Sequence, residues 1–258
     1  MTVSLDTLTS LLGAWLWPFF RVAALLTTAP LFGAAYVPVR VRLALALTLA
    51  LVLAPLVPVP AVDPFSVAGL LLVVQQLLVG LMLGVAVRLV LVVFDLAGQV
   101  ISQTMGLGFA AMVDPSTGAQ VPAVSQLYLI LASLVFVTIN GHLLMVQVLA
   151  QSFQVVPVGA GGIAVESFWA LATRAGWALG AGALLALPAV TAMLVVNLAF
   201  GVMTRAAPQL NLFAVGFPLT LMMGFMVILL TLPGVLSETE TVVGEALGFA
   251  SGLLVGGP

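Results

Sequence analysis

The sequence predicts an all-α protein of the integral membrane type. Of its 258 residues, 63% are hydrophobic and only 5% are charged, and the mean hydropathy is +1.34. Soluble domains carry about 25% charged residues, so a chain this apolar must face lipid or other protein over much of its surface. The apolar residues also fall into about six long runs, each with the length of a membrane helix.

The predicted helices are separated by short connections that contain proline. In order, they cover residues 8–30, 39–57, 66–94, 124–150, 167–200 and 212–233. The third and fifth would be about 40 and 50 Å long, against a hydrocarbon core of about 30 Å. Tilt, a kink at Pro188, or packing in an assembly that rises out of the membrane would accommodate this excess. With no internal repeat and no composition shift, we expect one domain over 1–258.

The few arginines indicate an orientation in the membrane. Arg40 and Arg42 follow the first predicted helix, Arg88 lies near the end of the third, and Arg205 follows the fifth. All four therefore fall at connections on one side of the membrane, and the positive-inside rule makes that side cytoplasmic.

Composition also narrows the chemistry. The chain has six arginines, no lysine and a formal charge of −2, so it offers no basic stripe for nucleic acid. It has no cysteine and one histidine, which leaves no ligand set for a metal. We expect no catalytic residue, no metal site and no cofactor.

Two glycine pairs predict close helix packing. Gly80 and Gly84 lie in "GLMLG", and Gly176 and Gly180 lie in "GWALG". A spacing of four places both glycines of a pair on one helix face, where another helix can approach. The partner helix can belong to this chain or to another subunit.

Several polar side chains lie inside the apolar runs, where lipid contact would be costly. They are Arg21, Gln75, Gln76, Asn140, His142, Arg174 and Asn197. We expect them to face a bundle, a cavity or a partner. Arg21 and Arg205 are interpreted as structural polar residues, and His142 as a packed, hydrogen-bonded histidine.

The stretch "QTMGLGFAAMVDPSTGAQVP", from Gln103 to Pro122, resembles neither neighbouring helix. Asp114 and Pro115 predict a turn. The methionines are adaptable apolar side chains and the glycines permit close backbone approach, so the segment can fill an irregular lumen and deform. Irregular backbone at membrane depth is tolerated only where it is buried in protein or lines a cavity. A constriction that opens would meet this condition.

Four stretches resemble the FliR/SctT family of type III secretion export-gate subunits. They are "FRVAALLTTAPLFGAAYVPVRVRLALALTLA" from Phe20, "GQVISQTMGLGFAAMVDPSTGAQVPAVSQ" from Gly98, "NGHLLMVQVLAQSFQVVPVG" from Asn140 and "NLAFGVMTRAAPQLNLFAVGFPLTLMMG" from Asn197. "GLGFAAMVDP" favours the flagellar branch over the injectisome branch.

The resemblance implies a helical export-gate assembly in the bacterial inner membrane, at the flagellar basal body. One copy would assemble with FliP and FliQ into a closed core, with FlhB near the cytoplasmic entrance, and unfolded flagellar substrates would pass through the pore. The resemblance also implies a plug that projects into this pore. Its residues would be Met105, Gly106, Gly108, Phe109, Met112, Asp114 and Pro115.

Two other classes of membrane protein share some of these features. A small-molecule secondary transporter also uses broken helices and intramembrane polar groups, but it predicts similar halves and an ion site at the midplane. A membrane-embedded enzyme needs paired titratable groups within the spans. The sequence favours neither class.

Overall fold

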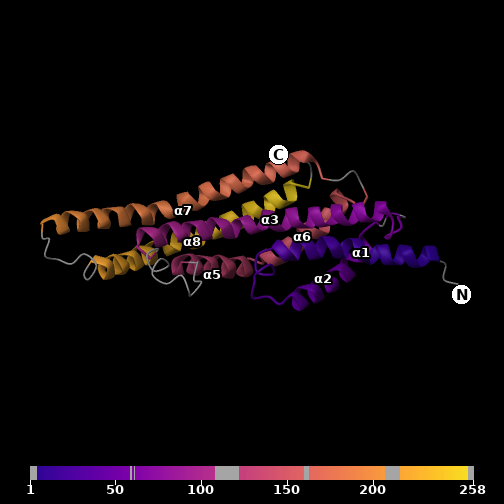
Figure 1. Cartoon of the computed structure of the whole chain (residues 1–258), viewed down its shortest axis with the longest axis horizontal. Helices are drawn as coiled ribbons and strands as arrows, with labels where there is room; N and C mark the ends of the chain where they lie inside the picture. The colour runs from indigo at the N-terminus through magenta and orange to yellow at the C-terminus, as the bar shows by residue number, and fades with distance from the viewer. Residues whose placement is uncertain are drawn as a thin grey trace. The chain divides into compact units, whose positions relative to one another are not determined.

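The computed structural model describes residues 5–58, 60, 62–107, 122–159, 163–206 and 216–254. Within these residues every regular element is a helix, which confirms the all-α prediction (Figure 1). The elements are α1 (Leu5–Thr28), α2 (Val39–Leu53), the short 3₁₀ helix η1 (Ala54–Leu56), α3 (Val67–Thr104), α5 (Ala123–Thr138), α6 (Gly141–Val155), α7 (Val165–Ala206) and α8 (Phe217–Gly252).

The described residues contain four helices long and apolar enough to cross a membrane, or five if the bent pair α5 and α6 counts as one span. Predicted helix four is therefore two helices. The break lies at Asn140, whose φ of +58° is left-handed and cannot continue a right-handed helix. Asparagine tolerates this conformation better than most residues.

Two other predicted helices ended too early. Helix α3 continues to Thr104 and α8 to Gly252, beyond the expected ends at 94 and 233. The sequence boundaries followed hydropathy, which falls at Asp95 and Pro233, but both residues lie inside helices. Arg88 consequently lies well within α3 rather than near its end, which weakens its value as an indicator of orientation.

Helix α3 begins at a capped turn. The Asp63 carboxylate accepts the Phe65 N–H (3.0 Å), and the Ser66 hydroxyl oxygen accepts the Gly69 N–H (3.0 Å). Ser66 directly precedes the helix, so its side chain satisfies one of the N–H groups that lack an intrahelical partner.

The chain divides into two compact units, and α3, α7 and α8 each run through a boundary between them. Unit 1 comprises residues 1–89, 137–175 and 243–258, and unit 2 comprises 90–136 and 176–242. No observation tests the prediction of a single domain over 1–258, and it stays a prediction.

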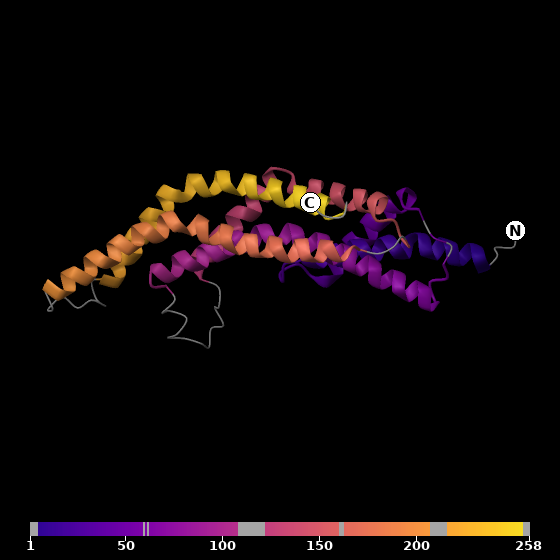
Figure 2. The ribbon, with the colours of Figure 1, turned by 90° about the horizontal axis from the view of Figure 1, so that it is seen from above.

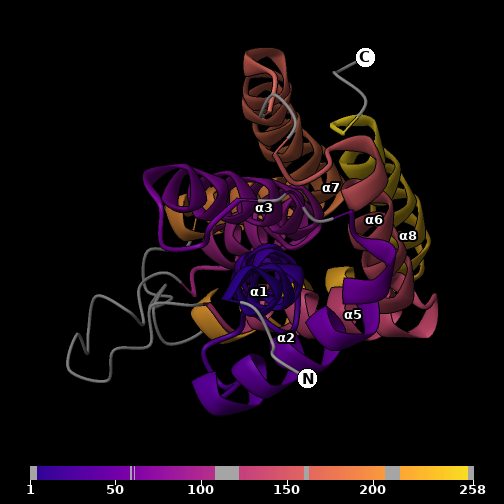
Figure 3. The same cartoon turned by 90° about the vertical axis from the view of Figure 1, so that its right-hand side faces the viewer.

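In unit 1, α1 lies between α2 and the first half of α3 (Figure 3). The glycine pair of α3 faces α1. A Cβ at Gly80 would overlap the carbonyl oxygen of Arg21, and one at Gly84 would overlap the hydroxyl oxygen of Thr28. The two backbones thus approach more closely than any larger residue would allow.

The second glycine pair faces away from the described chain. A Cβ at Gly176 or Gly180 would meet no described atom within 4 Å. The expectation that another helix packs on this face stays a prediction.

Unit 2 has its own apolar core, which includes Phe94, Ile101, Tyr128, Phe136 and Met193. In this unit α7 and α8 run antiparallel (Figure 2). Helix α7 approaches α3 at Gly182, where an added Cβ would lie 2.8 Å from the carbonyl oxygen of Val93. A small residue is needed at this point because the contact is with backbone.

Gly80→Ala should lower the stability of the protein by about 1–3 kcal/mol, because the new methyl group collides with backbone that cannot rotate away. Gly176→Ala is the matched control. Its methyl group has space, and alanine favours a helix over glycine by about 1 kcal/mol, so stability should hold or rise. The fraction of detergent-extracted protein that stays folded after heating measures the stability of both variants. Equal survival of Gly80→Ala and the parent would contradict the contact.

Candidate functional site

The end of α3 leads into the segment predicted to act as a plug. The Leu107 N–H donates to the Ser102 carbonyl (3.0 Å) and the Gly106 N–H to the Gln103 carbonyl (3.1 Å). This pair of bonds is a Schellman motif, which requires a left-handed residue, and Gly106 has φ +80°. Gly106 thus ends α3 and redirects the chain.

Met105 is fixed to α8. Its side chain is 1% exposed and lies against Gly224, where a Cβ would collide with the methionine sulfur and its neighbouring carbons. The absence of a side chain at Gly224 creates the space that Met105 fills. The end of α3 is therefore packed on α8 inside unit 2.

A third contact comes from α7. The Asn197 side-chain amide donates to the Thr104 carbonyl (3.1 Å), one of the carbonyls at a helix end that has no intrahelical partner. Around this bond lies an open pocket of about 350 Å³. Its walls are Gln103, Thr104, Met105, Gly106, Asn197, Phe200, Gly201, Gly216, Phe217 and Thr220.

The return side of the segment is held to α3 as well. The Ser125 hydroxyl, in the first turn of α5, donates to the Asp95 carboxylate, and Ser125 is fully buried. A Cβ at Gly98 would overlap the Cα of Ser125, so the two backbones touch. Asp95 was not among the predicted site residues, because the predicted third helix stopped at residue 94. An acid between two apolar stretches was the signal that could have revealed it.

The structure describes only the first part of the predicted plug. Met105 and Gly106 lie at the end of α3, while Gly108, Phe109, Met112, Asp114 and Pro115 lie outside the described residues. The plug assignment stays a prediction. Within unit 2, the described contacts show only that the end of α3 is tied to α7 and α8, and α3 to the start of α5.

Arg21 is the most constrained polar residue of unit 1. It is fully buried, and all three of its side-chain nitrogens donate hydrogen bonds: Nε to Gln76 Oε1 (2.8 Å), Nη1 to Ser152 Oγ (3.0 Å) and Nη2 to the Val156 carbonyl (2.8 Å). Its guanidinium carbon also lies 4.1 Å from the centre of the Phe153 ring. One side chain thereby joins α1, α3 and α6.

No acid pairs with Arg21 within the described residues. The positive charge is instead balanced by the C-terminal end of α6, because Val156 caps that helix and its carbonyl belongs to the negative end of the helix dipole. The face of Phe153 adds a cation–π attraction. The interpretation of Arg21 as a structural residue stays a prediction.

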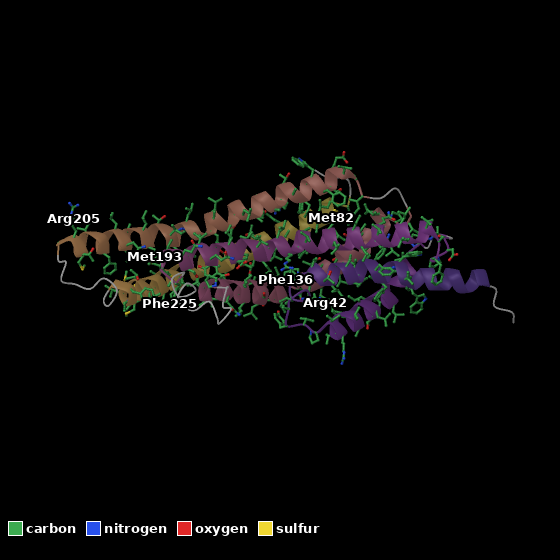
Figure 4. The ribbon with its side chains drawn as sticks, viewed as in Figure 1. Arg42, Met82, Phe136, Met193, Arg205 and Phe225 are labelled. Carbon is green, nitrogen blue, oxygen red and sulfur yellow. The ribbon has the colours of Figure 1, made fainter. Side chains whose placement is uncertain are left out.

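The other polar residues have separate environments. The buried His142 Nδ1 has no hydrogen-bond partner in the described chain, unlike the hydrogen-bonded histidine that we expected. Arg205 is exposed and projects from the end of α7 (Figure 4). Arg174 pairs with Glu245 at 2.8 Å and lies over the Phe249 ring. This ion pair was not foreseen, because the last helix was expected to end before Glu245.

The described residues contain no group of three or more histidine, cysteine or acidic side chains that could hold a metal.

Residues 12–251 match the family described as bacterial export proteins, family 1. The chain belongs to this family. It is 39% identical to the flagellar biosynthetic protein FliR of Pectobacterium carotovorum subsp. carotovorum over 92% of the chain and 91% of the relative. It is 35% identical to FliR of Escherichia coli (strain K12), over 95% and 94%, and 30% identical to FliR of Bacillus subtilis (strain 168), over 87% and 88%. This bacterial export protein is a membrane component of the flagellar export apparatus, and its resemblance to FliR is confirmed.

Arg21→Met should lower stability by about 2 kcal/mol or more, because Gln76, Ser152 and the Val156 carbonyl lose a charged donor in the interior. Arg21→Lys keeps the charge but lacks the planar guanidinium group and its several N–H donors, so the loss of stability should be intermediate. Arg205→Met is the control, since an exposed substitution usually changes stability by less than about 0.5 kcal/mol. Thermal unfolding in detergent ranks the three. Equal melting of the Arg21→Met and Arg205→Met variants would show that the hydrogen bonds of Arg21 add nothing.

Proposed function

We propose that this export protein is a subunit of the flagellar type III export gate, and that it forms with FliP and FliQ the pore through which unfolded flagellar proteins are secreted. The proposal places it in the bacterial inner membrane at the flagellar basal body, with FlhB at the cytoplasmic entrance, and gives it no enzymatic activity. The observation that carries the proposal is the similarity to flagellar FliR proteins over nearly the full length of both chains.

The length of α7 supports a protein assembly around the chain. Large exposed apolar side chains continue along α7 from Trp169 to Met203, a distance of about 50 Å at the helical rise. Even at a tilt of 40°, this stretch would cover about 40 Å of membrane depth, against a hydrocarbon core of about 30 Å. A straight helix at this tilt would extend beyond the hydrocarbon core, and partner subunits that rise above the membrane plane would cover the excess.

The transporter alternative has less support. The family match concerns export proteins, and no observation favours a midplane ion site. A transporter would be recovered as a monomer or a small homo-oligomer, whereas a gate subunit would be recovered with other chains.

A strain that lacks this protein should secrete no hook or filament protein and should be non-motile, because the proposed pore is the only route. Immunoblots of the medium and a motility assay measure this, and the restored gene is the control. In parallel, mild-detergent purification followed by mass measurement should yield a complex with FliP and FliQ. Normal filaments on the deletion strain would disprove the proposal, and a lone homo-oligomer would favour the transporter.

The proposal assigns the segment after α3 to the seal of the pore. Replacing Phe109 and Met112 by alanine removes apolar volume from that segment, so the resting pore should leak ions while the complex still assembles. Adding Met105→Ala should enlarge the leak, because Met105 packs the end of α3 on α8. Conductance or growth sensitivity measures the leak, with co-purification of partners as the control. If the variants assemble and leak no more ions than the parent, the segment is a turn and does not seal the pore.

A further inference from the structure

Asp95 is an acid inside an apolar membrane helix, and the proposed function assigns no role to it. It is half-buried in α3, and its carboxylate accepts a hydrogen bond from the fully buried Ser125 hydroxyl. Within the described residues its charge is not balanced by an ion pair. An ionisable group in such a helix is costly, so its hydrogen-bond partner indicates what it does.

The contact around Asp95 joins backbone to backbone. Gly98 lies one turn further along α3 on the same face, and a Cβ there would overlap the Cα of Ser125. Without a side chain at Gly98 the two helices touch, which brings the carboxylate within reach of the hydroxyl. The hydrogen bond and the glycine together fix both the separation and the register of α3 and α5 at this point.

The position of the contact in the chain is informative. Ser125 is the third residue of α5, whereas Asp95 lies nine residues before the end of α3 at Thr104. The start of α5 is thus fixed by Asp95, while the end of α3 is fixed separately, by Asn197 of α7 and by the packing of Met105 on Gly224. The two ends of the connection between α3 and α5 are held by different contacts.

We infer that Asp95 is a positioning residue. Through its hydrogen bond to Ser125, it holds the start of α5 against α3 and sets the distance between the two points from which the 107–122 connection leaves and returns. This role rests on the proposed function, because a fixed distance matters only if the connection contributes to the seal of a pore.

The chain has no cysteine, so this distance can be measured directly. Spin labels are attached to Gln103→Cys and Gln126→Cys, two exposed positions on α3 and α5, and the distance distribution is recorded by pulsed electron resonance in the complex purified with its partners. A complex without the introduced cysteines gives the background.

Ser125→Ala and Asp95→Ala should broaden the distribution, and the ratio of the parental distance to longer ones should fall about tenfold or more. Asp95→Asn keeps an acceptor oxygen and should retain the parental distance. Ser133→Ala, on the same helix, should also retain it. In cells, Ser125→Ala should raise ion leak while secretion continues.

An unchanged distribution in Ser125→Ala and Asp95→Ala would overturn the inference. A broad distribution in Asp95→Asn would also overturn it, since charge and not the hydrogen bond would then be decisive. If Ser125→Ala or Asp95→Ala broadens the distances but the pore does not leak, the contact is structural and Asp95 positions no seal. Normal secretion without the protein would instead reject the proposed function and leave the measured distances valid.

Discussion

Unit 1 depends on the buried positive charge of Arg21, with which no acid pairs in the part of the chain that the structure describes. The Arg21 guanidinium reaches Gln76 on α3 and the carbonyl end of α6 at Val156, and it does so because Gly80 and Gly84 let α1 lie directly on α3. A larger residue at either glycine would move the α1 backbone outward and lengthen these hydrogen bonds. Neutral dipoles suffice here because the donors are all satisfied and the end of a helix supplies negative potential.

In unit 2, glycines and hydrogen bonds fix the two ends of the connection between α3 and α5. Its connection between α3 and α5 is bounded by Gly106, which ends α3, and by Ser125, which contacts Gly98 and Asp95. Gly106 is needed for its positive φ, whereas Gly98 is needed because the Ser125 backbone approaches α3 more closely than a Cβ permits. At the Gly98 contact, the absence of a side chain lets the helices touch, and the hydrogen bond from Ser125 to Asp95 fixes their register.

Much of the fold, but few of the packing contacts, could be predicted from the sequence. Hydropathy alone indicated the all-α membrane fold, and the spacing of Gly80 and Gly84 indicated a close-packed face. Hydropathy failed at Asn140, where a single left-handed residue breaks an apolar run that contains no proline. It also failed at Asp95, because a polar residue inside a helix looks like the end of one until its partner 30 residues later is known. The partners of Arg21 come from segments more than 50 and 130 residues away, and no local pattern contains that information.

The packing of Met105 on Gly224 has a mechanical consequence. A methionine side chain has three rotatable bonds and a polarizable sulfur, so it can change shape at little cost while it continues to fill its space. Gly98 and Ser125, in contrast, are in backbone contact and cannot yield without separating the helices. Helix α3 thus has a compliant support at Met105 and a stiff one at Gly98. A force on the end of α3 would therefore rearrange the packing of Met105 before it separated Gly98 from Ser125.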